Sequence, residues 1–307
     1  MTAIIILNWN GADDTLACLD SLRNAAGDFF VVVVDNHSTD DSLARIAAWV
    51  EQGSPHAVHL LPLDDNYGFA RGNNLGIAHA LTLGADDLLL LNNDTEVEPD
   101  FLVRLLQFRA ENPAFRVLVP QINFGFDRSL VWNCGGRLVF GNRRYYYARK
   151  PESTIRESHF IPITFATGCA LFFDRGLLDA DARIFTERFF FGEEDFDFSL
   201  RMKEQHVRMA CVLSSKIYHK VSASGKHMNA VGRRYLHCLN RCIDIRLHYS
   251  PVAYALWTVT NIPLLVRNLR KGGASWSQSL RLTFRVLREA RHKDGVTHDD
   301  FNRLVLL

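Results

Sequence analysis

Two acidic clusters, far apart in the chain, contain the residues best suited to catalysis. The first, Asn92-Asn93-Asp94-Thr95, follows a run of leucines, and the second, Glu193-Glu194-Asp195-Phe196-Asp197, lies among phenylalanines. An apolar run that ends in amides and a carboxylate is how a buried parallel strand delivers polar ligands to the rim of a sheet. A carboxylate in apolar surroundings is held near its protonation threshold and can take a proton from an acceptor. The first cluster is therefore the candidate metal-binding carboxylate, and the second is the candidate catalytic base.

Asp94 can bind one divalent cation of the magnesium or manganese type. Such a cation usually takes one or two protein carboxylates and completes its shell with phosphate oxygens and water, which implies a diphosphate ligand. The alternative is a plain turn at the strand end, since Asn-Asn-Asp-Thr is also a good turn sequence. His219 follows an apolar run and is the candidate for a second metal or phosphate contact, although a lone histidine is more often just a hydrogen-bonded residue.

Three further polar features point to a nucleotide. Asp35 follows four valines and can accept a hydrogen bond from a pyrimidine ring N–H; alternatively it caps a helix that starts near Ser38. Residues 66–76 are rich in glycine and amides just before a helix, which favours an anionic ligand near the helix N-terminus. Arg71 is the only Lys or Arg between Arg45 and Arg104 and is a candidate diphosphate or base contact, with a surface salt bridge as the alternative.

The elements that must position these residues alternate between strand and helix. Short apolar runs predict strands over Ala3–Leu7, Phe29–Val34, Ala57–Leu63 and Asp87–Leu91, and the stretches between them predict helices over Asp13–Ala25, Asp40–Glu51 and Ala70–Leu83. This alternation predicts a parallel sheet that binds ligands beyond the carboxyl ends of its strands. The polar motifs sit at those ends: Asn8-Trp9-Asn10-Gly11, Asp35-Asn36, Asn66-Tyr67-Gly68 and Asn92-Asn93-Asp94.

The rest of the chain is harder to interpret. Within residues 115–190, the strand-like pieces Ile161–Phe165 and Ala170–Phe173 are expected to complete a mixed sheet and to form the wall where the acceptor sits. A helix is expected from about Glu194 to Gln205, and from Arg233 onward the pattern is helical and basic.

The composition is that of an ordinary soluble protein with enough apolar residues for a large core. The chain has 307 residues, of which 48% are hydrophobic and 22% are charged. The net charge of +1 conceals an asymmetry: residues 1–100 hold 16 Asp and Glu against 3 Lys and Arg, whereas residues 201–307 hold 19 Lys and Arg against 6 Asp and Glu. The N-terminal part is therefore not a nucleic-acid surface, and no nucleic-acid partner is expected.

The N-terminus is strand-like and shows neither the basic segment nor the cleavage site of a secretory signal, so we expect a cytoplasmic protein with reduced thiols. Six scattered cysteines favour core positions. The alternative is a metal site in which Cys238 and Cys242 share a helix face with His237 nearby, but no second zinc-like pair is present.

In order and spacing, these motifs resemble glycosyltransferase family 2, the inverting nucleotide-sugar transferases of GT-A fold, and within it the rhamnosyltransferase-like branch. The resemblance covers roughly residues 4–225 and rests on Asn8-Trp9-Asn10-Gly11, residues 34–40, Asn66 to Gly76, Leu91 to Thr95, Thr167-Gly168, Glu194 to Asp197 with Arg201, and His219 with Ser224-Gly225.

The resemblance assigns expected roles to individual residues. Asp195 looks like the catalytic base, Glu194 and Arg201 look like its supports, and Asp94 and His219 look like the metal or diphosphate ligands. The expected nucleotide-binding residues are Asn8, Asn10, Asp35, Asn66, Arg71 and Asn93. Among them, Asp35 looks like the contact to the nucleobase, and Asn93 looks like the ribose-side residue. One departure matters: the first acidic position of the family's DxD-type motif is here Asn92 or Asn93, which leaves charge compensation of the cation mostly to Asp94 and the diphosphate.

The implied architecture is an α/β GT-A domain over residues 1–228, with a Rossmann-like mixed sheet flanked by helices, followed by a basic, amphipathic helical region over residues 229–307. The implied activity is inverting, metal-dependent transfer of rhamnose or a related hexose from a dTDP- or UDP-sugar to a hydroxyl of a glycan or polyprenyl-linked saccharide, in cell-envelope polysaccharide synthesis. Mn²⁺ or Mg²⁺ is the expected cofactor.

Two alternative interpretations assign the chain to other functional classes. A dinucleotide-dependent oxidoreductase would share the early strand and helix pattern, but the first strand is followed by Asn8-Trp9-Asn10-Gly11 and not by G-x-G-x-x-G. A catalytically inert nucleotide- or glycan-binding module would keep the rim motifs yet lose the base, whereas Asp195 is present.

The basic C-terminal region mixes aromatic and aliphatic residues with arginines. The stretch from Pro251 is too interrupted by polar residues for a spanning helix, which needs about 20 apolar residues. An interfacial helix at the cytoplasmic face of the inner membrane fits better, because it buries one face and meets anionic headgroups with the other. The alternative is that these helices pack on the catalytic domain or form a homodimer contact.

Overall fold

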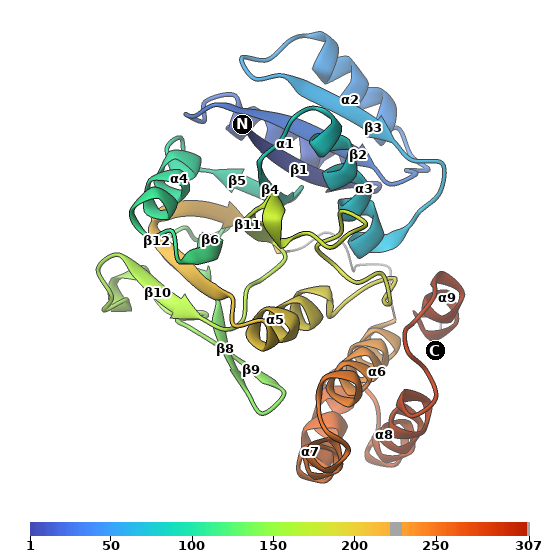
Figure 1. The fold of residues 1–307 in the computed structure, drawn as a ribbon. Coiled ribbons are helices and arrows are strands. Elements are labelled where there is room, and N and C mark those ends of the chain that lie inside the picture. The colour runs from blue at the N-terminus through green and yellow to red at the C-terminus, as the bar shows by residue number, and fades with distance from the viewer. Residues whose placement is uncertain (222–228, 306–307) are drawn as a thin grey trace.

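The N-terminal third of the chain forms the predicted alternation of strands and helices. The computed structural model describes residues 1–221 and 229–305. Its first elements are β1 (Thr2–Asn8), α1 (Ala12–Leu22), β2 (Phe29–Asp35), α2 (Ser42–Glu51), β3 (Val58–Pro62), α3 (Gly68–Thr82) and β4 (Asp87–Asn92). Strands β4, β1, β2 and β3 are adjacent and parallel, so the carboxyl ends that carry the polar motifs meet at one edge (Figure 1).

The middle of the chain extends this sheet. Its elements are β5 (Thr95–Val97), α4 (Phe101–Glu111), β6 (Phe115–Phe124), β7 (Val131–Asn133), β8 (Gly136–Val139), β9 (Asn142–Tyr145), β10 (Phe160–Ile163), β11 (Ala170–Asp174), α5 (Glu194–Glu204) and β12 (Arg208–His219), with short 3-10 turns at Glu152–Thr154 and Arg175–Leu177. The sheet order is β10-β12-β6-β11-β4-β1-β2-β3, with β5 on β12 and β7 on β6, and β8 and β9 form a separate hairpin. Because β11 runs antiparallel to both β4 and β6, the sheet is mixed, as predicted.

Both faces of the sheet are buried, and successive residues of each strand enter different cores. Ile5, Val32 and Leu90 pack on the side of α3, whereas Ile4 and Val33 pack on the side of α1 and α4. This is why the strands are continuous apolar runs and not alternating ones.

Two glycines of α3 allow that helix to lie close against the sheet. A Cβ atom at Gly72 would lie 2.6 Å from Leu7 Cδ1, and one at Gly76 would lie 2.6 Å from Ile5 Cγ2. Both distances are shorter than a van der Waals contact. The glycines that we associated with an anionic ligand therefore have a packing role at these two positions.

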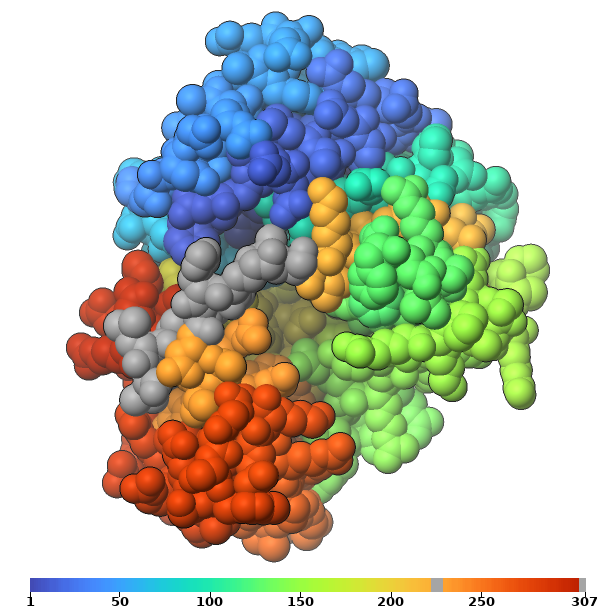
Figure 2. Space-filling view, turned by 180° about the vertical axis from the view of Figure 1, so that it is seen from behind, coloured from blue at the N-terminus to red at the C-terminus, as the bar shows by residue number. Residues whose placement is uncertain are grey.

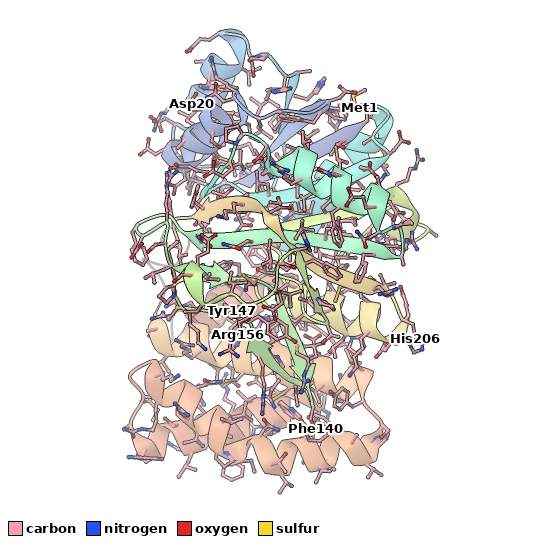
Figure 3. All side chains as sticks on the ribbon, turned by 90° about the vertical axis from the view of Figure 1, so that its left-hand side faces the viewer. Met1, Asp20, Phe140, Tyr147, Arg156 and His206 are labelled. Carbon is pink, nitrogen blue, oxygen red and sulfur yellow. The ribbon has the colours of Figure 1, made fainter. Side chains whose placement is uncertain are left out.

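The C-terminal region consists of α6 (Ala230–His248), α7 (Pro251–Lys271), α8 (Trp276–Ala290) and α9 (His298–Val305). These helices form a layer at one end of the molecule (Figures 1 and 3). They share one apolar core with the catalytic part, since Tyr235 and Trp257 pack in the same cluster as Phe165 and Phe196. The inner faces of these helices therefore pack on the catalytic domain, which was the alternative to a membrane-surface role. Membrane binding by their outer faces and a domain boundary at residues 228 and 229 stay predictions.

Two sequence expectations concern the chain as a whole. All six cysteines are buried and free, in agreement with their predicted core positions. Among the described residues, no helix combines the length and the apolar character that crossing a bilayer requires.

Candidate active site

The ends of β1 and β2 are joined by buried hydrogen bonds. Asn8 Nδ2 donates to Asp35 Oδ1 at 2.8 Å, and Ser38 donates to the same carboxylate from Oγ at 2.6 Å and from its backbone N at 3.0 Å. The next helix begins only at Ser42, so Asp35 orders the strand end and does not cap that helix. Its role as the nucleobase contact stays a prediction.

The same rim network reaches the end of β4. Thr15 Oγ1 donates to Asn8 Oδ1 at 2.7 Å, and Asn93 Nδ2 donates to Thr15 Oγ1 at 3.1 Å. Asn10, whose φ of 50° lies in the left-handed region, donates from its backbone N to Ser38 Oγ at 2.9 Å. The structure therefore brings Asn8, Asn10, Asp35 and Asn93 together into one connected polar edge.

Asn66 and Arg71 lie at the start of α3. Asn36 Nδ2 donates to Asn66 Oδ1 at 2.9 Å, which links this segment to the end of β2. The half-exposed Arg71 guanidinium lies 4.1 Å from the Tyr67 ring centroid, and its Nε lies 3.9 Å from a Glu187 oxygen. Arg71 therefore makes the surface ion pair that was the alternative interpretation, and a diphosphate contact stays a prediction.

Asp94 and His219 are adjacent and buried. His219 Nε2 lies 2.9 Å from Asp94 Oδ1, because β12 pairs with β5 directly after the Asp94 turn. Trp132 packs edge-on against the imidazole, with ring centroids 4.4 Å apart. Both ring nitrogens of His219 are buried without an aligned hydrogen bond to any described residue. Burial lowers the pKa of His219, but the neighbouring Cys169 and Asp94 outweigh it and raise the pKa to about 10, so the imidazole must lose a proton to bind a metal. Once deprotonated, an imidazole beside a carboxylate is a donor set that fits a divalent cation.

Asp195 occupies the first turn of α5, where the positive end of the helix dipole favours a carboxylate. Its side chain is 23% exposed, and Arg143 Nη1 donates to Oδ1 at 3.2 Å. Burial raises the pKa of Asp195, although Arg143 opposes the rise. A partly buried carboxylate that solvent still reaches and whose pKa is raised is suited to accept a proton.

Glu194 lies deeper than Asp195. Its Oε1 accepts a hydrogen bond from Gly192 N at 2.6 Å, and burial raises the pKa of the carboxyl to about 8. Glu194 therefore stabilises the turn that precedes Asp195.

The base and the metal-binding candidates are linked by a short path through residues 168–169. Asp195 Cβ lies 3.8 Å from the position of a Cβ atom built on Gly168. The next residue, Cys169, accepts a hydrogen bond at its carbonyl oxygen from Asn92 N at 2.8 Å, at the end of β4. Thr167-Gly168 thus connects the two acidic clusters, and this segment stood in the predicted set.

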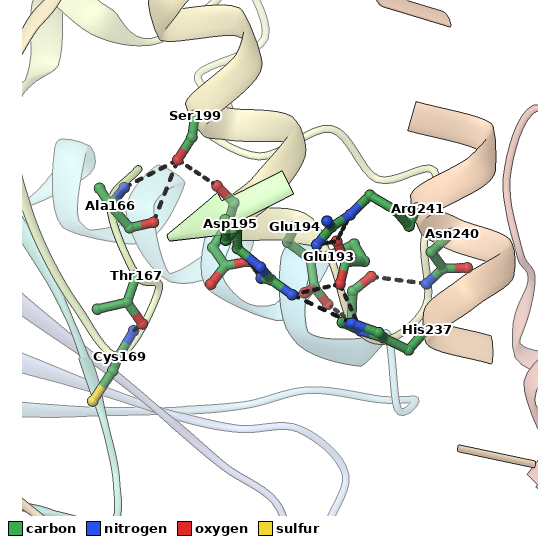
Figure 4. Close-up of polar contacts among 12 residues, drawn as sticks. Ala166, Thr167, Cys169, Glu193, Glu194, Asp195, Ser199, His237, Asn240 and Arg241 are labelled. Atoms are coloured by element: carbon green, nitrogen blue, oxygen red, sulfur yellow. Dashed lines mark hydrogen bonds and ion pairs between the residues drawn. The ribbon is translucent and has the colours of Figure 1, made fainter. Parts of the chain in front are cut away.

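Four residues of a buried ion cluster behind Asp195 were not assigned from the sequence. Glu193, whose side chain is fully buried, contacts Arg143 at 2.8 Å, His237 at 2.6 Å and Arg241 at 2.5 Å (Figure 4). Burial raises the pKa of the Glu193 carboxyl, but the two arginines and His237 outweigh that effect and hold the pKa well below its ordinary value. The spacing of His237 and Arg241 on one helix face was the available signal, whereas nothing in the sequence pointed to Arg143.

The expectation that Arg201 supports Asp195 is wrong. Arg201 Nε donates to Asp197 Oδ2 at 3.0 Å, because residues four apart on a helix face the same side. His248 Nε2 lies 3.0 Å from the other Asp197 oxygen. Burial raises the pKa of Asp197, but these partners lower it to about 2. The Ser224-Gly225 motif lies outside the described residues.

A second group of potential ligands lies beside Arg201. Asp197, Asp244 and His248 offer atoms within 4.8 Å of one another. Because Asp197 is already bonded to Arg201 and His248, this group is an ion-pair network and not the predicted metal position.

The comparison with family models decides the family. The model of glycosyl transferase family 2 matches residues 3–181. The chain belongs to this family. Its match to the dTDP-rhamnosyl transferase RfbF of Shigella flexneri is 21% identical and covers 74% of each chain. Its match to the low-salt glycan biosynthesis hexosyltransferase Agl10 of Haloferax volcanii is 22% identical and covers 67% of this chain but only 63% of that protein.

Solved structures agree on the fold of this family 2 chain. The mannosyltransferase PcManGT of Pyrobaculum calidifontis, in complex with GDP-Man and Mn²⁺, superposes with a TM-score of 0.59 at 16% identity, over 94% of this chain and 74% of that one. TarS 1–349 of S. aureus, in complex with UDP, gives a TM-score of 0.56 at 18% identity, over 99% of this chain and 90% of that one. The predicted GT-A fold is confirmed.

Proposed function

We propose that this family 2 protein is an inverting glycosyltransferase that moves a hexose from a nucleotide-diphosphate sugar to an acceptor hydroxyl. The observation that carries the proposal is the short path from Asp195, through Gly168 and Cys169, to the strand end that holds Asp94. With Asp195 as the proton acceptor and Asp94 beside the diphosphate, this path supports a single-displacement reaction.

In the proposed step, Asp195 takes the proton of the acceptor hydroxyl. The acceptor oxygen forms a bond to the anomeric carbon, the bond from that carbon to the diphosphate oxygen breaks, and its electron pair leaves with the nucleoside diphosphate. Because attack and departure occur on opposite sides, the anomeric configuration inverts.

Asp94 and His219 are the residues that would hold a divalent cation. Mn²⁺ in the structure of the archaeal mannosyltransferase supports this assignment by analogy. A bound cation would supply positive charge beside the leaving diphosphate. The polar edge of Asn8, Asn10, Asp35 and Asn93 would bind the nucleoside, with Asn66 and Arg71 beside it.

We propose rhamnose or a related hexose, carried by dTDP or UDP, as the donor. The support is similarity to a dTDP-rhamnosyl transferase and to a structure with bound UDP. Thermal unfolding with dTDP-, UDP- and GDP-sugars, each with Mn²⁺, tests the donor, because a ligand of the folded state raises the unfolding temperature. Product analysis by NMR then tests inversion, and an inert nucleotide-binding module would bind a donor without forming product.

The outer face of α7 and α8 supports a further proposal, that the protein binds a membrane surface where a polyprenyl-linked acceptor of cell-envelope synthesis would be presented. Apolar side chains on this face remain exposed to solvent, although the inner faces of the two helices are buried. The exposed fractions lie between 61% and 80% for Val252, Val259, Trp276 and Phe284. These helices lie on the outside of the molecule, away from the N-terminal strands (Figure 2).

Charge on this outer face fits anionic lipid. Residues 251–288 contain no Asp or Glu, and their exposed cations are Arg267, Arg270, Lys271, Arg281 and Arg288. Arg285 is half-buried and forms an ion pair with Glu289. Aromatic and aliphatic side chains among cations are typical of helices that lie in a membrane interface. A homodimer that buries the same face is the competing outcome.

A further inference from the structure

We propose that Arg143 is the positioning residue of the catalytic base, and that Glu193 couples it to helix α6. This inference rests on the proposed role of Asp195. It assigns to the C-terminal helical region a part in setting up the base, in addition to any part in acceptor binding.

Arg143 bridges two carboxylates at the start of α5, those of Glu193 and Asp195. Its Nη1 donates to Asp195 Oδ1 at 3.2 Å, and its Nη2 donates to Glu193 Oε1 at 2.8 Å. The guanidinium lies 5.2 Å from the ring centroid of Phe165, and its side chain is only 13% exposed. A planar, fixed cation of this kind limits the rotation of its partner carboxylate and favours the ionised form of that carboxylate.

Glu193 holds Arg143 in place from the opposite side. Its φ of 76° lies in the left-handed region, which is uncommon for a residue with a side chain, and the preceding Gly192 has a φ of 89°. The backbone stays in this conformation because the Glu193 carboxylate is bound by three cationic or hydrogen-bonding side chains (Figure 4). The turn that delivers Asp195 is therefore held by side-chain contacts outside its own segment.

Helix α6 and the β8–β9 hairpin supply the other contacts of this cluster. Arg241 Nε donates to Glu193 Oε2 at 2.6 Å, and Arg241 Nη1 donates to the Gly141 carbonyl at 3.2 Å. Asn240 Nδ2 donates to the carbonyl of Gly192 at 2.8 Å. Figure 3 shows Phe140, beside Gly141 at the hairpin tip, near the C-terminal helices. The Gly192–Glu193 turn before Asp195 thus lies between the hairpin and α6, and side chains of both donate hydrogen bonds to it.

The charged groups around Asp195 affect the pH at which this carboxylate is ionised and can accept a proton. The cations Arg143 and Arg241 favour ionised Asp195, whereas the carboxylate of Glu193 opposes ionisation. The neighbouring Glu194 carboxyl and the Tyr145 hydroxyl also face Asp195; burial raises the pKa of each, and the negative charge of Asp195 contributes to the rise. Loss of the Arg143 charge would leave burial and Glu193 dominant, so the base would stay protonated up to higher pH. Arg143 also engages Oδ1, which orients the carboxylate while the acceptor hydroxyl approaches.

The test is the pH dependence of kcat/KM for the full chain carrying Arg143→Gln, measured with the dTDP- or UDP-sugar that the donor panel selects. We expect the acidic limb of the profile to move to higher pH by about 1 to 3 pH units, with activity partly recovered at alkaline pH. Arg143→Lys keeps the charge and should restore most of the limb's position. Arg144→Gln is the matched control, because this neighbouring arginine is exposed.

A structural role alone would lower activity equally at every pH, so an unmoved limb in Arg143→Gln overturns the proposal. Asp195→Asn separates this failure from a failure of the proposed function. If Asp195→Asn is inactive while the Arg143→Gln limb is unmoved, only the Arg143 assignment is wrong. If Asp195→Asn retains turnover, the base itself is misassigned. Where Arg143→Gln does not fold, Arg143→Lys is measured alone: its acidic limb should stay near that of the parent while kcat falls, because an ammonium lacks the two-pronged guanidinium that binds both carboxylates. An unchanged kcat in Arg143→Lys then overturns the positioning role.

Discussion

His219 Nε2 lies 2.9 Å from Asp94 Oδ1, although the two residues are 125 positions apart in the chain. The contact exists because β12 and β5 pair antiparallel, with His219 opposite Thr95. Two candidate metal ligands that the sequence could only name separately are therefore one site.

The first prediction concerns this pair. Asp94→Asn and His219→Ala should each lower transfer by about 10- to 100-fold or more, because loss of a ligand weakens cation binding. A chelator should reproduce the loss, and Mn²⁺ should reverse it. Thermal stabilisation of the parent by Mn²⁺ with UDP, lost in both variants, gives a readout independent of activity. Full activity in chelator would contradict the prediction, and exposed Asp28→Asn serves as the control.

The second prediction concerns the base. Asp195→Asn keeps the side-chain shape but cannot accept a proton, so turnover should fall by about 10²- to 10⁴-fold while nucleotide affinity stays within a few-fold. Steady-state kinetics and nucleotide titration measure the two quantities. Retained turnover would place the base elsewhere, with Glu194 or Asp197 next to be tested.

The third prediction concerns stability and Glu194. Its folded pKa of about 8 is raised above the ordinary value of 4.5, so the protonated form is the stable buried form. Between those two pH values, each pH unit should cost the parent about 1.4 kcal/mol of unfolding free energy at this site. Glu194→Gln cannot ionise and can still accept from Gly192 N. Its stability relative to the parent should therefore increase with pH up to about 8, as measured by denaturant unfolding. A difference that does not change with pH would refute the assignment.

The fourth prediction follows from the corrected partner of Arg201. Arg201→Ala should destabilise the fold by about 3 kcal/mol, because it removes a cation from the fully buried Asp197. Burial raises the pKa of Asp197, but His248, Arg201, Arg188 and Thr186 together lower it to about 2 from 3.8. The part of this stabilisation that Arg201 contributes is therefore present above pH 3.8 and is lost as the pH falls through 2. The stability gap between variant and parent should therefore narrow in acid. Unlike Arg143→Gln, this variant should leave the acidic limb of kcat/KM where it is.

The fifth prediction concerns the outer face of α7 and α8. The protein should sediment with anionic vesicles at low salt, less at high salt, and not with zwitterionic vesicles, because headgroup attraction is screened. Replacing Val252, Val259 and Trp276 by serine should reduce sedimentation without lowering the unfolding temperature, since these side chains are exposed. If the parent stays in the supernatant and instead forms a dimer that the triple variant lacks, the face is a dimer contact.

Sequence alone was enough for the strands, helices and rim motifs of the N-terminal third. Runs such as the four valines before Asp35 have one stable environment, a strand buried on both faces, and polar residues that follow such strands must emerge at the same edge. The sequence also indicated the candidate base, because Asp195 belongs to a group of acidic residues that lie among phenylalanines at the start of a helix.

Only the tertiary structure decided which side chains meet. The family resemblance assigned Arg201 to support Asp195, but helical geometry directs it to Asp197. Arg143 lies on a hairpin far from the base in sequence, and Arg241 lies on α6, yet both reach Glu193. Local patterns encode periodicity and strand ends, whereas a buried ion cluster depends on how separate elements pack together, and no single segment carries that information.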